Sequence, residues 1–336
     1  MILAHDTRRT TPRFRNGLLA ALAIAVGVAS WAGTSAAKPT AAPILRPRFA
    51  ITGRSDGSRF LQPYGVAFDP TDGAIYVSNT GQHRIEVFSA AGRPLAQFIH
   101  RVRRPDGQVV DGMPGPLAFD HNQHLLVVDP VARYVDVLDL RARSLAHLQV
   151  PEGTPTAVTV AKDGTIFVGT SSEASRVYRF HPDYSTAGSW GTEGTAPGTL
   201  TNIVALSFID DTTLAAASAR TDLAVQFFTR DGRYLRGFGT HDVGDGNFSL
   251  PSGMVTTPDG RLWVLDEIRQ VLQVFDGQGT FLARSEGTGT TLGDFVHPSS
   301  LAADDHGLMA VVDREVGRVR VFAIAPPPVD VKHVQP

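Results

Sequence analysis

Residues 61–69 read Leu-Gln-Pro-Tyr-Gly-Val-Ala-Phe-Asp, and residues 73–88 continue as Gly-Ala-Ile-Tyr-Val-Ser-Asn-Thr-Gly-Gln-His-Arg-Ile-Glu-Val-Phe. Short runs of β-branched and aromatic residues alternate here with Gly, Asp and Asn, a pattern typical of antiparallel strands joined by tight turns. Together with residues 92–98, this stretch predicts a unit of four short strands.

The same unit recurs six times along the chain. Its third strand ends at a large apolar residue, and these residues follow one another at intervals of 42 to 50 positions: Phe88, Leu138, Phe180, Phe228, Phe275 and Phe322. A period in the forties with four strands per repeat predicts blades arranged around a central channel. The expected fold class is therefore all-β, a six-bladed β-propeller of four-stranded antiparallel blades.

The two ends of the repeat region predict how the ring closes. The sixth repeat stops after its third strand, at residues 322–324, whereas residues 48–53 form an orphan strand before the first repeat. That orphan resembles the fourth strand at 234–239. Because an open ring would leave strand edges unpaired, we expect residues 49–51 to pair with residues 319–321 and complete the last blade.

The N-terminal segment has the features of an export signal. Four arginines between positions 8 and 15 precede an apolar run at 18–28 and small residues at 34–37. The expected division is a signal peptide at 1–37, a linker at 38–47, the propeller at 48–324 and a disordered tail at 325–336. A periplasmic or extracellular location follows, with no stable membrane span after cleavage. Retention as an uncleaved anchor, and export by the general or the twin-arginine route, stay open.

Composition narrows the function further. The 336 residues are 42% hydrophobic and include no cysteine, which excludes disulfides, thiolate metal sites and a cysteine nucleophile. The formal net charge is −2, and past the N-terminal arginines the chain carries no basic block. A nucleic-acid partner is therefore not expected.

Several repeats resemble the NHL repeat consensus. Residues 61–67 and 79–88 form one good copy, residues 248–253 with Asp266 and Arg269 a second, and residues 295–298 with Asp313 and Arg318 a third. The resemblance covers roughly residues 48–324 and implies a propeller. It implies function only weakly, because members include protein-binding and RNA-binding modules, receptor sensor domains and a few enzymes.

A polar loop between the second and third strands is the best-marked recurring feature. It pairs an Asp or Asn with an Arg, as in Asp129 with Arg133 and Asp266 with Arg269. In the structural interpretation, the Asx side chain accepts turn N–H groups while the Arg packs across the blade. In the functional interpretation, these loops form a ring on one rim that grips a protein, peptide or cell-envelope glycan. The predicted contacts are Tyr64, His83, Arg84, Arg133, Arg176, Arg220, Arg269 and Arg318.

Binding without catalysis is the main functional prediction, and a metal-dependent lyase or hydrolase using the channel is the alternative. The positions where the inner strands begin include no carboxylate that could ligate calcium: Tyr64, Pro116, Thr156, Asn202, Ser252 and Ser299. His83 and His297 fall near the rim, but no histidine pair has zincin spacing. Composition leaves a Ser/His/Asp triad open, although no Gly-x-Ser-x-Gly elbow is present. We therefore predict no catalytic residue, metal or cofactor.

Overall fold

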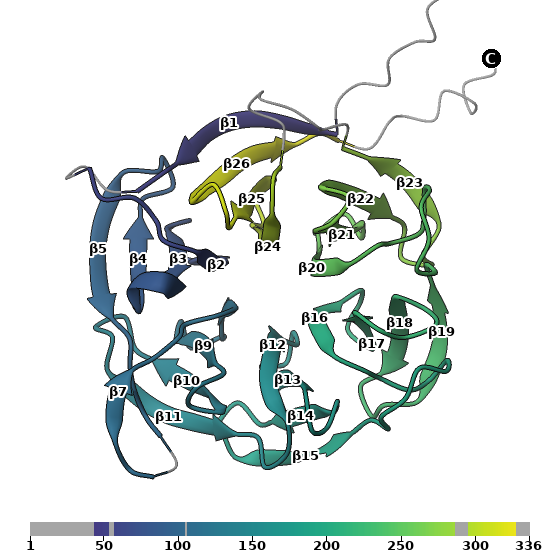
Figure 1. Ribbon diagram of the computed structural model, residues 1–336, viewed down its shortest axis with the longest axis horizontal. Coiled ribbons are helices and arrows are strands. Elements are labelled where there is room, and N and C mark those ends of the chain that lie inside the picture. Colours follow the sequence, from purple (N-terminus) through teal and green to yellow (C-terminus); the bar gives the residue numbers. More distant parts are fainter. Residues whose placement is uncertain (1–43, 54–56, 105, 286–294, 327–336) are drawn as a thin grey trace, which may run out of the picture. The chain divides into compact units, whose positions relative to one another are not determined.

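The computed structural model describes residues 44–53, 57–104, 106–285 and 295–326. Six sheets of four antiparallel strands are arranged radially, and the first strand of each blade lies nearest the centre (Figure 1). The predicted six-bladed propeller is confirmed. The predicted signal peptide, and residues 327–336 of the predicted tail, lie outside the described residues.

The strands of each blade follow one another in the chain, except in the last blade. Blade 1 contains β2 (Pro63–Phe68), β3 (Ile75–Asn79), β4 (Arg84–Phe88) and β5 (Pro94–Ile99). Blade 2 contains β8 (Leu117–Phe119), β9 (Leu125–Asp129), β10 (Tyr134–Leu138) and β11 (Ser144–Gln149); blade 3 contains β12 (Thr154–Val160), β13 (Ile166–Ser171), β14 (Val177–Phe180) and β15 (Thr186–Trp190). Blade 4 contains β16 (Ile203–Phe208), β17 (Thr213–Ser218), β18 (Val225–Thr229) and β19 (Tyr234–Phe238); blade 5 contains β20 (Pro251–Thr256), β21 (Leu262–Asp266), β22 (Val271–Phe275) and β23 (Phe281–Arg284). Blade 6 contains β24 (Pro298–Ala303), β25 (Leu308–Asp313), β26 (Arg318–Ile324) and β1 (Leu45–Ile51).

The ring closes as the sequence predicts. Strand β1 pairs antiparallel with β26, with Phe49 opposite Val321 and Ile51 opposite Val319. The strand begins at Leu45, so the end of the segment expected to be a linker belongs to the propeller. The physical reason is that Leu45 is buried in the core formed with Phe322, which makes its inclusion in the sheet favourable.

The apolar core lies between neighbouring blades. The large apolar residue at or near the end of the third strand is buried in every blade, with exposed fractions of 3% or less from Phe88 to Phe322. Each sheet therefore buries both of its faces against its two neighbours, as stacked blades require.

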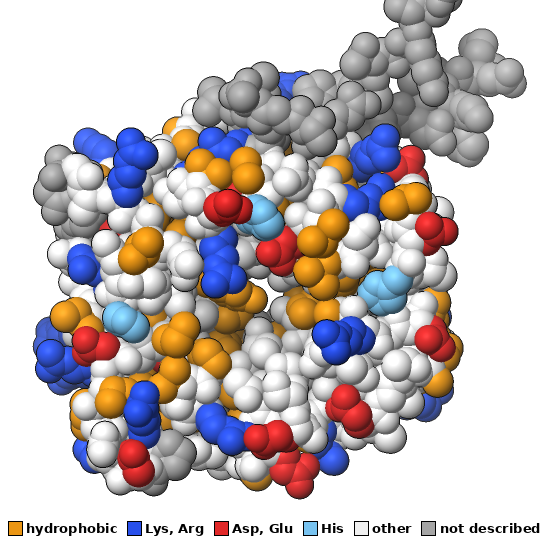
Figure 2. Space-filling view, viewed as in Figure 1, with side chains coloured by type: hydrophobic (Ala, Val, Ile, Leu, Met, Phe, Trp, Pro, Cys, Tyr) orange, Lys and Arg blue, Asp and Glu red, His pale blue; other side chains and the backbone are white. Residues whose placement is uncertain are grey.

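Hydroxyl groups tie the inner strands together around the centre. Thr156 donates a hydrogen bond to the first strand of blade 4, Ser252 donates to the Pro298 carbonyl at 2.9 Å, and Ser299 donates to the Tyr64 carbonyl at 3.2 Å. Figure 2 shows a face that is hollowed at its centre, with hydrophobic side chains bordering the opening. The inner strands thus frame a channel mouth.

Two local elements were not predicted. A hairpin of β6 (Arg101–Arg103) and β7 (Val109–Asp111) lies between blades 1 and 2, and a 3₁₀ turn, η1 (Thr80–Gln82), joins β3 to β4. Within the described parts of the chain, no helix is long and apolar enough to span a membrane.

Candidate functional site

The buried Asp and Asn residues at the ends of the second strands fix the loops on one rim. Asp266 accepts hydrogen bonds from the backbone N–H of Ser249 at 2.7 Å and of Leu250 at 3.2 Å. Asn79 accepts the N–H of Leu61 at 2.8 Å in the same way. Each of these side chains therefore holds the loop that leads into the inner strand of its own blade, which agrees with the structural interpretation of the repeat.

The predicted rim arginines lie at equivalent turns of the six blades and do not gather into one site. Arg220 is exposed. The other five donate hydrogen bonds to the protein itself: Arg84 to Gln97, Arg133 to Gly153 and Glu173, Arg176 to Ser189, Arg269 to Gly244 and Asn247, and Arg318 to Asp313. Each of these five guanidinium groups therefore has at least one hydrogen-bond partner within the ring. His83 is exposed on the same rim, and its ring Nδ1 contacts the Gly112 carbonyl oxygen at 2.7 Å.

One group of charged side chains does converge, where blades 5, 6 and 1 meet. His297, just before β24, is fixed by its backbone on both sides. Its N–H donates to the Asp313 carboxylate at 2.9 Å, and its carbonyl accepts the N–H of Arg314 at 2.9 Å. Its ring lies between two carboxylates, with Nδ1 3.6 Å from Glu267 and Nε2 2.9 Å from Glu315.

Tyr64 adds a phenol to this group from the inner strand of blade 1. The Arg314 guanidinium lies over its ring, 5.8 Å from the centroid. Burial raises the pKa of the Tyr64 phenol above its usual value; the positive charge of Arg314 opposes this rise and the negative charge of Glu267 adds to it. Tyr64 therefore stays protonated at neutral pH and can donate a proton or a hydrogen bond.

We define Tyr64, Glu267, His297, Arg314 and Glu315 as the mouth cluster. It combines an imidazole, a neutral phenol and a guanidinium at the rim where the inner strands β2 and β24 begin. These are the parts that acid–base catalysis on a small molecule requires.

The sequence alone identified only part of the mouth cluster. Tyr64 and His297 were placed near the channel and the rim, whereas Glu267, Arg314 and Glu315 were missed. The available signal was their position, because Glu267 and Arg314 come directly after the buried aspartates that end β21 and β25. In the other four blades the equivalent residue is uncharged: Thr80, Pro130, Ser171 and Ala219.

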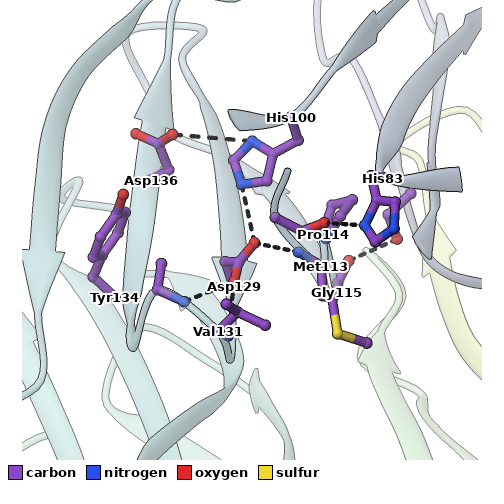
Figure 3. A network of polar contacts seen from close by, with 12 residues as sticks. His83, His100, Met113, Pro114, Gly115, Asp129, Val131, Tyr134 and Asp136 are labelled. Carbon is purple, nitrogen blue, oxygen red and sulfur yellow. Dashed lines mark hydrogen bonds and ion pairs between the residues drawn. The ribbon is translucent and has the colours of Figure 1, made fainter. Parts of the chain in front are cut away.

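A second polar network lies at the base of the β6–β7 hairpin (Figure 3). The ring of His100 is buried between two carboxylates, with Nε2 3.4 Å from Asp129 and Nδ1 4.0 Å from Asp136. Asp129 also accepts the N–H groups of Met113 at 2.7 Å, Val131 at 2.8 Å and Ala132 at 2.9 Å.

The pKa values of the two carboxylates in this network are shifted in opposite directions. For Asp129, burial opposes ionisation, but the contact with His100 and the hydrogen bonds from Ala132 and Met113 outweigh it and lower the pKa. For Asp136, burial dominates and raises the pKa despite the hydrogen bond from Ser144 and the nearby histidines. Both side chains are closed off from solvent, so we interpret this network as a support for the hairpin.

A serine, a histidine and an aspartate also meet at the edge of this network, but not as a catalytic triad. The His147 Nε2 atom lies 3.1 Å from the Ser144 hydroxyl and 3.7 Å from Asp136. A triad requires the serine and the aspartate on opposite ring nitrogens, whereas here both contact the same one. Across the described residues, no group of three His, Asp or Glu side chains is arranged to hold a metal ion.

Comparisons with known proteins identify the fold. No protein-family model matches the chain, and no curated protein matches its sequence, so the NHL resemblance stays a prediction. Among solved structures, a gluconolactonase from Xanthomonas campestris is similar with a TM-score of 0.60 and 18% identity, over 84% of this chain and 97% of that one. A virginiamycin B lyase from Staphylococcus aureus, in a catalytically inactive histidine-to-alanine variant with quinupristin, is similar with a TM-score of 0.59 and 11% identity, over 82% and 99%.

Proposed function

We propose that this protein is a hydrolase or lyase that performs acid–base catalysis at the mouth of its channel. One observation carries the proposal: the His297 ring lies between two carboxylates, 3.6 Å from Glu267 and 2.9 Å from Glu315, and Arg314, from the same loop as Glu315, lies over the Tyr64 ring. This replaces binding by the rim as the favoured function, because the rim arginines are dispersed over six blades, whereas the mouth cluster converges.

Each group has a defined part in ester or lactone hydrolysis. His297 takes a proton from water, whose oxygen forms the new bond to the acyl carbon. Arg314 stabilises the negative charge that develops on the carbonyl oxygen. The acyl–oxygen bond then breaks, Tyr64 gives its proton to the departing alkoxide, and the proton on His297 returns to Tyr64 through solvent. In a lyase, His297 would instead remove a proton from carbon, and Tyr64 would protonate the leaving group.

The names of two similar structures support this class of chemistry. One is a gluconolactonase and the other a lyase acting on virginiamycin B, and the latter is described as inactive when a histidine is replaced by alanine. Fold similarity at these identities does not transfer an activity, so the proposal depends on the mouth cluster.

The direct test compares the wild type with His297→Ala on glucono-lactone and on quinupristin, following acid release and product mass. Loss of general acid–base catalysis should lower the rate by about 10²- to 10⁴-fold. His306→Ala is the matched control, because His306 lies exposed in the turn between β24 and β25 of the same blade. Equal rates for the wild type and His297→Ala would contradict the proposal.

A further inference from the structure

We infer that the substrate of the mouth cluster carries an apolar chain, and that Leu61, Ile268 and Val316 hold this chain. This inference rests on the proposed function, because it names the class of substrate for the same site. We call these three residues the apolar arc. The inference is carried by the exposure of the arc, its connection to the mouth cluster, and the polar loops on the far side of the ring.

The side chains of the apolar arc are exposed although all three are aliphatic. Their exposed fractions are 52% for Leu61, 61% for Ile268 and 43% for Val316. Among the described residues, eleven large hydrophobic side chains are exposed: six lie in loops at the mouth end of the ring, four lie on outer strands, and only Leu140 lies in a turn at the other end. The mouth end is therefore where the ring presents apolar surface for contact.

The apolar arc belongs to the same loops as the mouth cluster. Each of its members lies close in the chain to a member of the cluster: Ile268 directly follows Glu267, Val316 directly follows Glu315, and Leu61 lies three residues before Tyr64. The arc is thus not a set of scattered surface residues, because all three come from blades 5, 6 and 1, which also supply the cluster.

Contacts between neighbouring blades bring these loops together. The Gln270 side chain of blade 5 donates a hydrogen bond to the Val296 carbonyl at 2.7 Å, just before the mouth-cluster histidine. In blade 6, a Cβ added to Gly317 would lie 2.7 Å from the Phe60 carbonyl oxygen, just before the arc leucine. The loops that carry the arc therefore follow one another without a gap from blade 5 to blade 1.

Leu61 is presented to solvent at a fixed position. Its backbone N–H donates to Asn79 at 2.8 Å, and its carbonyl accepts the N–H of Gly81 at 2.9 Å. A Cβ added to Gly81 would lie 2.8 Å from the Leu61 Cγ atom, so the leucine side chain rests on this glycine. An apolar side chain that is already ordered loses little conformational entropy when a ligand covers it.

The loops across the ring are polar and set the direction of the chain. Blades 3 and 4 lie opposite blades 6 and 1 (Figure 1). Their loops between the second and third strands expose Ser172, Glu173, Arg220 and Asp222. On the face shown in Figure 2, hydrophobic side chains lie among the charged ones around the hollow centre. Apolar surface beside a few polar groups is typical of sites for small organic molecules, so the arc favours a substrate with an aliphatic chain over a sugar lactone.

The experiment varies the chain and keeps the reacting ring. Hydrolysis is measured for γ-valerolactone, γ-octalactone and γ-decalactone, which carry a methyl, a butyl and a hexyl group. Binding is measured by ligand-detected NMR for 2-methylcyclopentanone and 2-hexylcyclopentanone, which keep the ring and its carbonyl but cannot be hydrolysed. Full burial of one methylene is worth about 4-fold in affinity, and the arc covers a chain on one side only. We therefore expect about 2-fold per methylene, or about 30-fold from methyl to hexyl, in both kcat/KM and binding.

The variants test whether the arc is the source of this preference. The double variant Ile268→Ser with Val316→Ser should lose most of it, and circular dichroism checks that the variant is folded. Leu61 is left in place because it packs against Gly81. Leu140→Ser is the matched control, because Leu140 is 57% exposed at the other end of the ring and should leave the whole series unchanged.

Binding of the ketones decides this inference, and the rate of His297→Ala decides the proposed function. A preference for the hexyl ketone that the double variant loses and Leu140→Ser keeps supports the arc. Equal binding of the two ketones by the wild type, or a preference that survives unchanged in the double variant, overturns it, even if His297→Ala still abolishes hydrolysis. If the arc binds the hexyl ketone but wild type and His297→Ala hydrolyse the lactones at equal rates, the proposed function fails while the apolar site stands.

Discussion

Replacing Asp129 by alanine should strongly destabilise the propeller. Asp129 is fully buried at the end of β9 and receives three backbone N–H groups, while its second oxygen also faces His100 (Figure 3). The alanine variant leaves these donors without an acceptor and opens the root of the β6–β7 hairpin.

The magnitude follows from the partners that are lost. An unsatisfied buried donor costs about 1–3 kcal/mol, but Met113 and Val131 are partly reached by water, which places their cost at the lower end. Including the loss of the carboxylate beside His100, we expect a decrease of about 3–5 kcal/mol in the free energy of unfolding. Asp129→Asn should cost less, because Asn79 serves at the equivalent place in blade 1.

The assay is urea unfolding followed by circular dichroism at several pH values. Because the folded-state pKa of Asp129 is lowered, its ionised form adds stability above the ordinary pKa of 3.8, and this contribution is lost as the pH falls through the folded value. The difference between wild type and Asp129→Ala should therefore be greatest near neutral pH and shrink in strong acid.

A matched control and a refuting result complete the test. Asp305, an exposed residue in a turn of blade 6, should tolerate alanine within about 0.5 kcal/mol. A cost below about 1 kcal/mol for Asp129→Ala, or a cost independent of pH, would show that the carboxylate does not anchor the loop as the geometry indicates.

Three further predictions concern closure, titration and the rim. Ile51→Ala should lower the free energy of unfolding by about 2–5 kcal/mol, measured by urea denaturation, because Ile51 is buried in the core between β1 and blade 1; no change would mean that β1 does not close the ring. Asp136→Asn should stabilise the protein at pH values above the ordinary carboxyl pKa. Burial raises the pKa of Asp136, so its ionisation weakens the fold as the pH rises. Equal dependence of the free energy of unfolding on pH for the two proteins would oppose this. Alanine at Arg84, Arg133 and Arg269 together should leave hydrolysis unchanged, whereas reduced recovery of a protein, peptide or glycan in a pull-down would favour binding by the rim.

The architecture could be predicted from the sequence because its determinants are local. A strand of alternating residues followed by a polar turn recurs in every repeat, and in four of the six the turn carries a Gly, such as Gly73 after Asp69. The pairing of β1 with β26 also followed, since a missing fourth strand and an orphan strand can satisfy each other only by closure. The start of β1 at Leu45 could not be predicted, because it depends on a core contact with the last blade.

Most of the mouth cluster could not be predicted from the sequence, because its determinants are not local. Its members come from three blades, and no spacing within one repeat brings Glu267, His297 and Tyr64 together. These residues come together only because the loops at the rim adopt particular conformations. Backbone contacts such as the one between Arg314 and His297 fix those conformations. The β6–β7 hairpin between blades 1 and 2, which forms a separate two-stranded sheet, lacks a repeat pattern and gave no comparable signal.

The pairing of β1 with β26 sets the order of events during synthesis. The ribosome makes β1 before every other strand and β26 after every other strand. Strand β1 therefore cannot pair until the whole propeller has been synthesised. At 5–20 residues per second, that wait lasts on the order of tens of seconds. Until then, the backbone N–H and C=O groups of β1 have no strand partner and are open to foreign strands. A nascent chain of this design therefore benefits from a chaperone that shields its beginning until its end emerges.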